Sequence, residues 1–370
     1  MARKTKQRPL QDLPGLFDNF AGSSPAQSEM SINFGSANTN ANTAINQSKE
    51  PNKSVTTKNE LTKLSPITHN QNLRFISFGS GSSGNCAFLG DDKSGILIDA
   101  GVDNNKVVKE LEKNGISMDF IKGICITHDH GDHIRFAYSI VRRYRHIGIY
   151  CTPKALNGIM RRHNISRRFK DYHRPIYREI PFEIDNFKIT AFEVSHDGTD
   201  NVGFFIENGN HRFAIATDLG CITPRVDHYM RQAQYIMLES NYDHEMLVTG
   251  KYPEYLKARI KADNGHLDNT VAARYISEIY SNKLSHVFLC HLSNDNNTPN
   301  IALATMTKPL FEKVYKIGDG TEGVLSIDAD IQIMALPRFD SSQLYVLRAK
   351  KLNLSYILLL YNSSLRLWGN

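Results

Sequence analysis

The sequence has no pair of cysteines spaced to hold a metal or to build a disulfide framework. Its five cysteines contain no Cys-x-x-Cys pair and lie mostly in or beside apolar, strand-like runs; they are Cys86, Cys125, Cys151, Cys221 and Cys290. Disulfide-rich scaffolds and zinc knuckles need paired or closely spaced cysteines. We therefore interpret these five as buried thiols of a protein in a reducing compartment.

Long apolar runs are also absent. The longest, around Ile357–Tyr361, falls far short of the roughly 18 residues that a membrane helix needs. The basic opening Met1–Arg8 is followed by polar residues and not by an apolar core, so no signal peptide is expected. No internal repeat occurs at a fixed period. These absences predict a cytoplasmic protein that has no membrane partner.

Apolar and aromatic residues are scarce at the N-terminal end. Residues 1–72 are rich in Ser, Asn, Thr, Gln and Lys and show no sustained periodicity. Such a segment cannot bury enough apolar surface to offset its loss of conformational entropy, and we expect a disordered polar tail. The composition changes at Leu73, and residues 73–347 are expected to form the folded part. Residues 348–370 have no pattern that we can interpret.

Short apolar runs separated by Gly, Ser and Asp turns predict the strands. These runs are 73–78, 86–90, 95–99, 123–127, 187–195, 202–208, 211–217, 235–239, 286–290 and 323–327. Apolar residues at helical spacing predict helices over 104–114, 224–233 and 268–280, and another from about residue 299. Strands that alternate with helices in this way favour an α/β fold of layered sheets covered by helices.

The most informative stretch follows the predicted strand 123–127. It is Thr127-His128-Asp129-His130-Gly131-Asp132-His133. Three imidazoles and a carboxylate in one tight turn suit zinc, manganese or iron. His128 and His130 alternate and can face one ion, whereas Asp132 and His133 can face a second. The alternative is a polar loop that is rich in histidine by chance.

This motif and the strands before it resemble the metallo-β-lactamase superfamily, whose signature is His-x-His-x-Asp-His. The resemblance implies a four-layer αββα fold over 73–347, with further ligands that each end a strand. It implies that His196 completes one metal, that Asp218 bridges both metals and that His291 completes the second. It also implies that Asp99 supports the ligands from behind.

Two divalent ions, zinc or manganese, would define the chemistry. Two ions about 3.5–4 Å apart lower the pKa of a bridging water, hold it as hydroxide, and polarise a carbonyl or phosphoryl oxygen. The expected reaction is therefore hydrolysis with the hydroxide as nucleophile. Asp132 is placed to orient that hydroxide as well as to bind metal.

The positive charge of the chain is concentrated in one segment. Between Arg142 and Arg178 there are eleven Lys and Arg residues and one acidic residue, Asp171, whereas the whole chain has a net charge of +6. Aromatic residues are interleaved, and such a patch is typical of a nucleic-acid partner. The expected contact residues are Arg142, Arg143, Arg161, Arg162, Arg167 and Arg168. The alternative is a solvated, arginine-rich pair of helices.

A further histidine lies in Gly265-His266-Leu267-Asp268-Asn269. This element is similar to Gly-His-Leu-Ser-Asn of the YycJ/WalJ family, metallo-β-lactamase-fold proteins associated with exonuclease activity on DNA. In related phosphodiesterases a non-ligand histidine backed by an acid protonates the leaving oxygen, which implies catalytic roles for His266 and Glu239. The alternative is that His266 only caps the next helix. Asp268, which replaces the family's serine, would repel a phosphate and suits an N-cap.

The Ser/Gly loop 79–85 also matches that family. Its backbone N–H groups would cradle a phosphate, or else the loop is a plain hairpin turn between two strands.

Together these features predict a metal-dependent phosphodiester hydrolase of nucleic acid, with DNA favoured and 5′-to-3′ exonuclease action implied by the resemblance. The alternatives are a hydrolase of a small ester, thioester or lactam, an RNA-processing nuclease, and a non-catalytic nucleic-acid-binding protein. Gln11–Phe17 resembles short peptides that bind the sliding clamps of replication, so such a clamp is a candidate partner. A chance apolar cluster is the alternative for that peptide.

Overall fold

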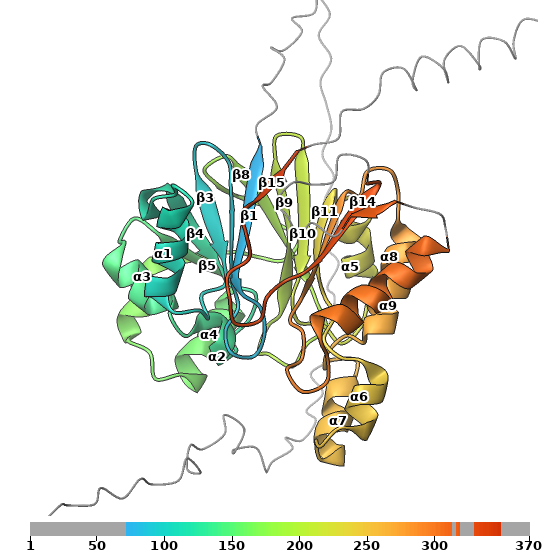
Figure 1. Ribbon diagram of the computed structural model, residues 1–370. Coiled ribbons are helices and arrows are strands. Elements are labelled where there is room, and N and C mark those ends of the chain that lie inside the picture. Colours follow the sequence, from blue (N-terminus) through green and yellow to red (C-terminus); the bar gives the residue numbers. More distant parts are fainter. Residues whose placement is uncertain (1–71, 313–315, 319–328, 349–370) are drawn as a thin grey trace, which may run out of the picture. The chain divides into compact units, whose positions relative to one another are not determined.

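The computed structural model describes residues 72–312, 316–318 and 329–348, which all belong to one unit of the chain, Leu64–Asn370 (Figure 1). The predictions for the polar tail, for Gln11–Phe17, for a strand over 323–327 and for the residues after 348 lie outside the described residues.

Two β-sheets form the centre of this unit, with strand orders β15-β1-β2-β3-β4-β5-β6 and β13-β14-β12-β11-β10-β9-β8-β7. The first sheet contains β1 (Leu73–Gly79), β2 (Cys86–Gly90), β3 (Gly95–Ile98), β4 (Ile121–Cys125), β5 (Gly148–Cys151), β6 (His173–Pro175) and β15 (Tyr345–Leu347). The second contains β7 (Phe182–Ile184), β8 (Phe187–Glu193), β9 (Val202–Asn208), β10 (His211–Ala216), β11 (Tyr235–Glu239), β12 (His286–Cys290), β13 (Ile317–Gly318) and β14 (Ile331–Ala335). The predicted strands that fall on described residues are confirmed, to within two residues at each end.

The helices join and cover these strands. They are α1 (Asn104–Lys113), α2 (Gly131–Ile134), α3 (Ala137–Arg143), α4 (Pro153–Arg162), α5 (Pro224–Met230), α6 (His244–Thr249), α7 (Glu254–Lys261), α8 (Asn269–Ile279) and α9 (Pro299–Phe311), with 3-10 helices η1 (Met118–Phe120) and η2 (Arg167–Tyr172). The four predicted helices are confirmed as α1, α5, α8 and α9. Helices α6 and α7 were not predicted from sequence because each is short and buries a single side chain, Leu247 or Lys257.

Apolar side chains from both sheets fill the space between them. Phe75 of β1 packs against Phe213 and Phe288 of the second sheet, with ring centroids 5.3 and 4.6 Å apart. Along β1 the neighbouring Ile76 and Phe78 belong to a different cluster, on the outer face of the first sheet. Successive side chains of a strand point to opposite faces, so the continuous apolar runs in the sequence reflect burial on both faces.

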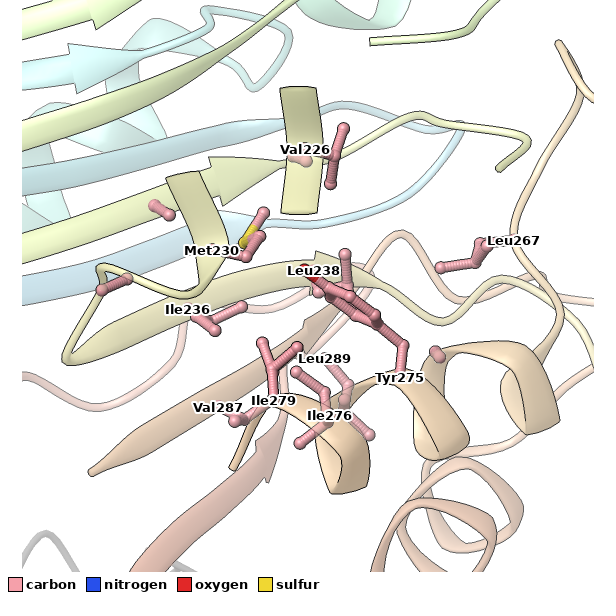
Figure 2. Close-up of a cluster of buried hydrophobic side chains, with 14 of the residues drawn as sticks. Val226, Met230, Ile236, Leu238, Leu267, Tyr275, Ile276, Ile279, Val287 and Leu289 are labelled. Carbon is pink, nitrogen blue, oxygen red and sulfur yellow. The ribbon is translucent and has the colours of Figure 1, made fainter. Parts of the chain in front are cut away.

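Helices cover the outer face of each sheet (Figure 1). Side chains of α1, α3 and α4 pack on the first sheet. On the second sheet, Val226 and Met230 of α5 and Ile276 of α8 pack against Ile236 and Leu238 of β11 (Figure 2). The order helix, sheet, sheet, helix confirms the predicted four-layer αββα fold.

Side-chain caps start the helices near the edge where the predicted ligands lie. Thr152 caps α4, Asp243 caps α6 and Asp268 caps α8, where its carboxylate accepts the Thr270 N–H at 2.6 Å. The capping role predicted for Asp268 is therefore confirmed. Within the described residues, no helix combines the length and apolar character needed to cross a membrane.

Candidate metal centre

The predicted ligands follow strands that end at one edge of the sheets. Strands β3 and β4 are parallel neighbours in the first sheet, and β10, β11 and β12 are parallel neighbours in the second. The carboxyl ends of parallel strands meet at one edge, where α/β proteins place their sites. Asp99 follows β3, His128 follows β4, Asp218 follows β10 and His291 follows β12. His196 follows β8, which is antiparallel to β9 and so runs in the same direction as β10.

The structure brings all the predicted metal ligands together. Two groups have ligand atoms that all lie within 4.8 Å of one another: His128, His130 and His196 in one, and Asp132, His133 and His291 in the other. The Asp218 carboxylate lies between the groups, 3.8 Å from His196 Nε2 and 3.2 Å from His133 Nε2. Each of the two groups could hold an ion, and Asp218 lies between them.

Four of the histidines place Nδ1 against a protein oxygen. The distances are 3.0 Å from His128 to Thr127 Oγ1, 2.8 Å from His133 to Asp99 Oδ2, 3.0 Å from His196 to the Gly265 carbonyl, and 2.8 Å from His291 to Glu239 Oε1. An acceptor at Nδ1 favours the tautomer in which Nε2 carries the lone pair, as metal-bound histidines require.

Several of those Nε2 atoms have no hydrogen-bond partner. Among the described residues, Nε2 of His128, His196 and His291 is buried and unpartnered. Buried polar atoms without partners are rare in folded proteins. A divalent cation would satisfy them, and imidazole and carboxylate donors suit zinc or manganese. The donor set therefore fits the metal that the sequence implies.

The electrostatics of the site favour bound cations. Burial lowers the pKa of His128 well below its usual value and that of His130 to about 4, so both are neutral and able to coordinate metal at pH 7. Burial alone would also lower the pKa of His291, but the carboxylates of Asp218, Asp132 and Glu239 raise it to about 10. These carboxylates favour a positive charge at the centre, which metal ions can supply in place of a proton.

Asp99 lies behind His133, as predicted. It is 1% exposed, and besides His133 Nδ1 it accepts the backbone N–H of Thr127 at 2.8 Å. Its φ of 60° and the φ of 53° at His291 are uncommon for residues with a Cβ. The surrounding hydrogen bonds hold Asp99 in this conformation, and with it the orientation of the His133 ring.

Asn85 was not predicted as a site residue. Its Nδ2 lies 3.2 Å from Asp132 Oδ2 and 2.9 Å from His133 Nε2, and its backbone N–H donates to the Asp132 carbonyl at 2.8 Å. The backbone of Gly101 also lies very close to Asp132. A Cβ on Gly101 would lie 1.5 Å from the Asp132 carbonyl oxygen. Only glycine fits at Gly101.

The Ser/Gly loop therefore has a role other than the predicted phosphate cradle. The N–H groups of Ser80, Gly81, Gly84 and Asn85 donate to the Arg338 carbonyl, Asn85 Oδ1, the Gly81 carbonyl and the Asp132 carbonyl. These four donors are already used, so the cradle prediction is wrong for them. The loop instead holds Asn85 against two predicted ligands.

His266 and Glu239 form a pair. His266 Nδ1 lies 2.7 Å from Glu239 Oε1, and the His266 ring is 23% exposed, whereas Glu239 is fully buried. The same Oε1 is 2.8 Å from His291 Nδ1. Burial alone would raise the pKa of Glu239, but His266 and His291 lower it, so the carboxylate stays charged. Glu239 thus orients both histidines, and His266 is the one that solvent reaches.

The predicted nucleic-acid contacts are divided between two places. Arg142 and Arg143 lie exposed in the last turn of α3, which leads to the first residue of β5. Nearby His146 contacts the carbonyl of Met118, just before the first residue of β4. The structure therefore places Arg142 and Arg143 at the amino ends of these strands, the edge opposite the metal ligands.

The other arginines lie nearer to the centre or along η2. Arg161 and Arg162 end α4, and Arg162 Nε is 3.5 Å from the carboxylate of Asp129, within the His-rich motif. Arg167 and Arg168 are exposed on η2, where Arg168 pairs with Asp171 at 3.7 Å. Among the six, Arg162 is the one that the structure ties to the metal loop.

Two aspartates next to predicted ligands were also missed. The buried Asp129 accepts the Thr199 N–H at 2.8 Å. Asp197 lies 3.3 Å from His130 Nε2 and accepts a hydrogen bond from Arg259 of α7 at 2.9 Å. Their position beside histidine ligands was the only signal in the sequence, and it does not tell which way a carboxylate points.

A family model, the beta-lactamase superfamily domain, matches residues 95–291, more than half of the chain. The chain belongs to the metallo-β-lactamase superfamily. The matched stretch begins at β3 and ends at His291, so it includes every predicted metal ligand of this superfamily member.

Similar proteins extend the match. Exodeoxyribonuclease YycJ of Bacillus anthracis is 30% identical over 256 residues, which are 68% of this chain and 94% of that protein. Exodeoxyribonuclease WalJ of Streptococcus pneumoniae is 27% identical over 245 residues, 66% of this chain and 91% of that protein. The metallo-beta-lactamase fold protein YhfI from Bacillus subtilis is 13% identical with a TM-score of 0.53, covering 75% of this chain and 99% of that one, which supports the fold alone. This superfamily member is a YycJ/WalJ-like enzyme of the metallo-hydrolase class.

Proposed function

We propose that the chain is a metal-dependent exonuclease that hydrolyses phosphodiester bonds of DNA in the 5′-to-3′ direction. The observation that carries the proposal is its similarity, over nearly their whole length, to relatives named exodeoxyribonucleases. The basic end of α4 beside the metal loop agrees with a polyanionic substrate. A hydrolase of a small ester, thioester or lactam has no use for that charge.

The predicted ligands hold two divalent ions in this proposal. When bound, such ions supply a nucleophile from water and polarise the phosphoryl oxygen. Asp132 orients the attacking group, helped by Asn85, which lies 3.2 Å from its carboxylate. Asp99 and Glu239 hold His133 and His291 in the required tautomer.

His266 is the proposed general acid. Breaking a phosphodiester leaves a sugar oxygen with a high proton affinity, and a positioned donor accelerates that step by roughly 10²–10⁴-fold. Nδ1 of His266 is occupied by Glu239, which leaves Nε2 as the atom that faces substrate. The ring centroid lies 5.2 Å from both His196 and His291, next to both ligand groups.

The basic test uses labelled nucleic acid. DNA and RNA, single and double stranded and labelled at either end, are incubated with the protein and zinc or manganese, with and without a chelator. We expect DNA to be shortened stepwise from its 5′ end and chelation to stop the reaction. Degradation of RNA alone would favour the RNA-processing alternative, and binding without cleavage would favour a non-catalytic protein.

The role of His266 is tested by its dependence on the leaving group. His266→Ala should reduce DNA cleavage by about 10²–10⁴-fold and affect bis(p-nitrophenyl) phosphate much less, because p-nitrophenolate leaves without a proton. The exposed His228→Ala is the matched control and should change neither rate. Glu239→Gln is less specific than His266→Ala as a test of the general acid, because Glu239 also contacts the predicted metal ligand His291.

Metal content separates the remaining roles of His266. Its side chain also lies within reach of a group formed by Asp218, Glu239 and His291. If His266→Ala lost metal by elemental analysis, the residue would be a ligand. If it lost activity equally on both substrates, it would position the phosphate, and the acid would have to be another group.

A further inference from the structure

A cavity that the proposed mechanism does not use lies behind the Ser/Gly loop. Its volume is about 260 Å³, just below the roughly 300–1,000 Å³ of small-molecule sites. Its walls come from the loop, from the turn after β3, from the start of α1, from the link between α2 and α3, and from the segment after β14. The lining residues that decide its chemistry are Gly101, Asp103, Lys106, Arg135, Arg338 and Phe339.

Only one layer of backbone separates this cavity from the metal centre. Gly101 lines the cavity, and its far side touches the Asp132 carbonyl. The Gly101 N–H donates to the Asn85 carbonyl at 2.8 Å, and Asn85 itself contacts Asp132 and His133. Gly101 and Asn85 therefore connect the wall of the cavity to the predicted ligands Asp132 and His133.

The cavity has a net positive charge. Lys106, Arg135 and Arg338 line it, and their side chains donate to the carbonyl oxygens of Phe339, Ser83 and Leu292. Within the described residues none of the three forms an ion pair with a carboxylate, while Asp295 attracts Arg338 electrostatically. Asp103, the one acidic lining residue, has its carboxylate occupied by backbone N–H groups of α1. Cations without a paired carboxylate favour an anionic ligand.

An exposed aromatic ring stands beside these cations. Phe339 is 60% exposed, and the Arg338 guanidinium lies over its ring at 5.5 Å from the centroid. Nucleobases stack on exposed aromatic rings and on guanidinium planes. Base-stacking and anion-binding groups thus occur around one cavity.

We propose that this cavity binds one nucleotide of the DNA strand, with its base on Phe339 and its phosphate at Arg135 and Lys106. The inference rests on the proposed function and names a second contact site for the same substrate. Neither Arg161 nor Arg162 lines this cavity, so it would be a contact site separate from the end of α4.

The test is a binding experiment with a fluorescent base. Single-stranded DNA with 2-aminopurine near its 5′ end and phosphorothioate linkages that resist cleavage is titrated with the metal-loaded protein. Stacking quenches 2-aminopurine, so we expect quenching by wild type. Phe339→Ala should remove it and weaken binding by roughly 5- to 150-fold, the effect of removing one base stack.

One further variant is a matched control, and another tests the phosphate contact. Phe311 on α9 is 62% exposed, close to Phe339, and lies outside the cavity, so Phe311→Ala should leave quenching and affinity unchanged. Arg135→Gln should lower the salt dependence of binding by about 0.7 in log–log slope, the value for one phosphate contact of a single strand. Hydrolysis of bis(p-nitrophenyl) phosphate should be unchanged in all three, which also verifies that each variant is folded.

The outcomes separate this inference from the proposed function. If Phe339→Ala and Arg135→Gln bind, quench and cleave like wild type, the cavity is not a nucleotide site although the nuclease assignment stands. If Phe311→Ala loses as much quenching as Phe339→Ala, the stacking surface is elsewhere and the inference fails. If wild type cleaves no DNA with metal present, the proposed function fails, whatever the quenching shows.

Discussion

Replacement of Asp99 by asparagine tests how far the metal centre depends on groups behind its ligands. Asparagine has the same shape and tolerates a positive φ, so the φ of 60° at this position is preserved. The substitution changes the hydrogen bonding instead. One carboxylate oxygen accepts the Thr127 N–H at 2.8 Å, and the other lies 2.8 Å from His133 Nδ1. An amide has only one oxygen.

Neither orientation of the new amide restores both bonds. With its NH₂ toward His133, two donors face each other unless His133 changes tautomer, and that change would put a proton on the Nε2 that faces the metal. With its NH₂ toward Thr127, a buried backbone N–H loses its acceptor, and in both orientations the negative charge is gone. Loss of such a supporting partner weakens metal affinity by about 10–100-fold, which is ~1.4–2.7 kcal/mol.

Competition with a chromophoric chelator measures this change as a metal dissociation constant. Asp91→Asn is the matched control, because Asp91 is also fully buried and accepts two backbone N–H groups, from Lys93 and Ser94, in the turn between β2 and β3. It should reduce stability and leave metal affinity unchanged. An Asp99→Asn protein that binds metal as tightly as wild type would refute the role assigned to Asp99. Equal losses in the two variants would point to general destabilisation.

Two further predictions concern charge. The double variant Arg161→Gln, Arg162→Gln should lower the log–log slope of DNA affinity against salt concentration by about 0.7–0.9 for each phosphate contact that is lost. The control Arg142→Gln, Arg143→Gln, at the opposite edge, should leave that slope unchanged. An equal effect of both double variants in a salt titration would contradict this division. Burial alone would raise the pKa of Asp91, but hydrogen bonds from backbone and side-chain amides lower it. The stabilisation by Asp91 is therefore present above the usual aspartate pKa of about 3.9 and is lost as the pH falls through the lower folded pKa. Urea unfolding should accordingly show wild type more stable than Asp91→Asn at neutral pH, and that difference should shrink in acid; a difference that stays constant with pH would exclude the ionised Asp91 carboxylate as its cause.

The later metal ligands were predicted by the resemblance, and the strand pattern located them because each follows a strand. Strands buried on both faces leave continuous apolar runs, and a polar residue at the end of such a run is conspicuous. His196, Asp218 and His291 each end one of these runs, and the direction of the strands brings them to one edge. His266 and Glu239 were also predicted by the resemblance, and the structure places them 2.7 Å apart.

The residues that were missed depend on how loops fold back. Asn85 reaches Asp132 because the turn between β1 and β2, which contains Asn85, contacts Gly101 in the turn after β3. No local sequence pattern predicts that contact. The basic segment shows that closeness in sequence does not give closeness in space. Helix α3 crosses from the carboxyl end of β4 to the amino end of β5, so Arg142 and Arg143 leave the edge that Arg162 shares with the metal ligands.

Asp129 explains how the metal loop and the basic helix stay together. Its carboxylate accepts the N–H of Thr199 at 2.8 Å and lies 3.5 Å from Arg162 Nε, and its own carbonyl lies 2.6 Å from His163 Nε2. Helix α4 can approach this closely because Gly158 has no Cβ. A Cβ at this position would lie 2.1 Å from the Asp129 carboxylate and would clash with it. The histidines on either side of Asp129 belong to the predicted ligand groups, whereas Asp129 faces α4, since alternate residues of an extended loop point in opposite directions. One stretch of chain thus fixes the predicted ligands His128 and His130 relative to Arg162, the cation that the proposed function assigns to the DNA strand.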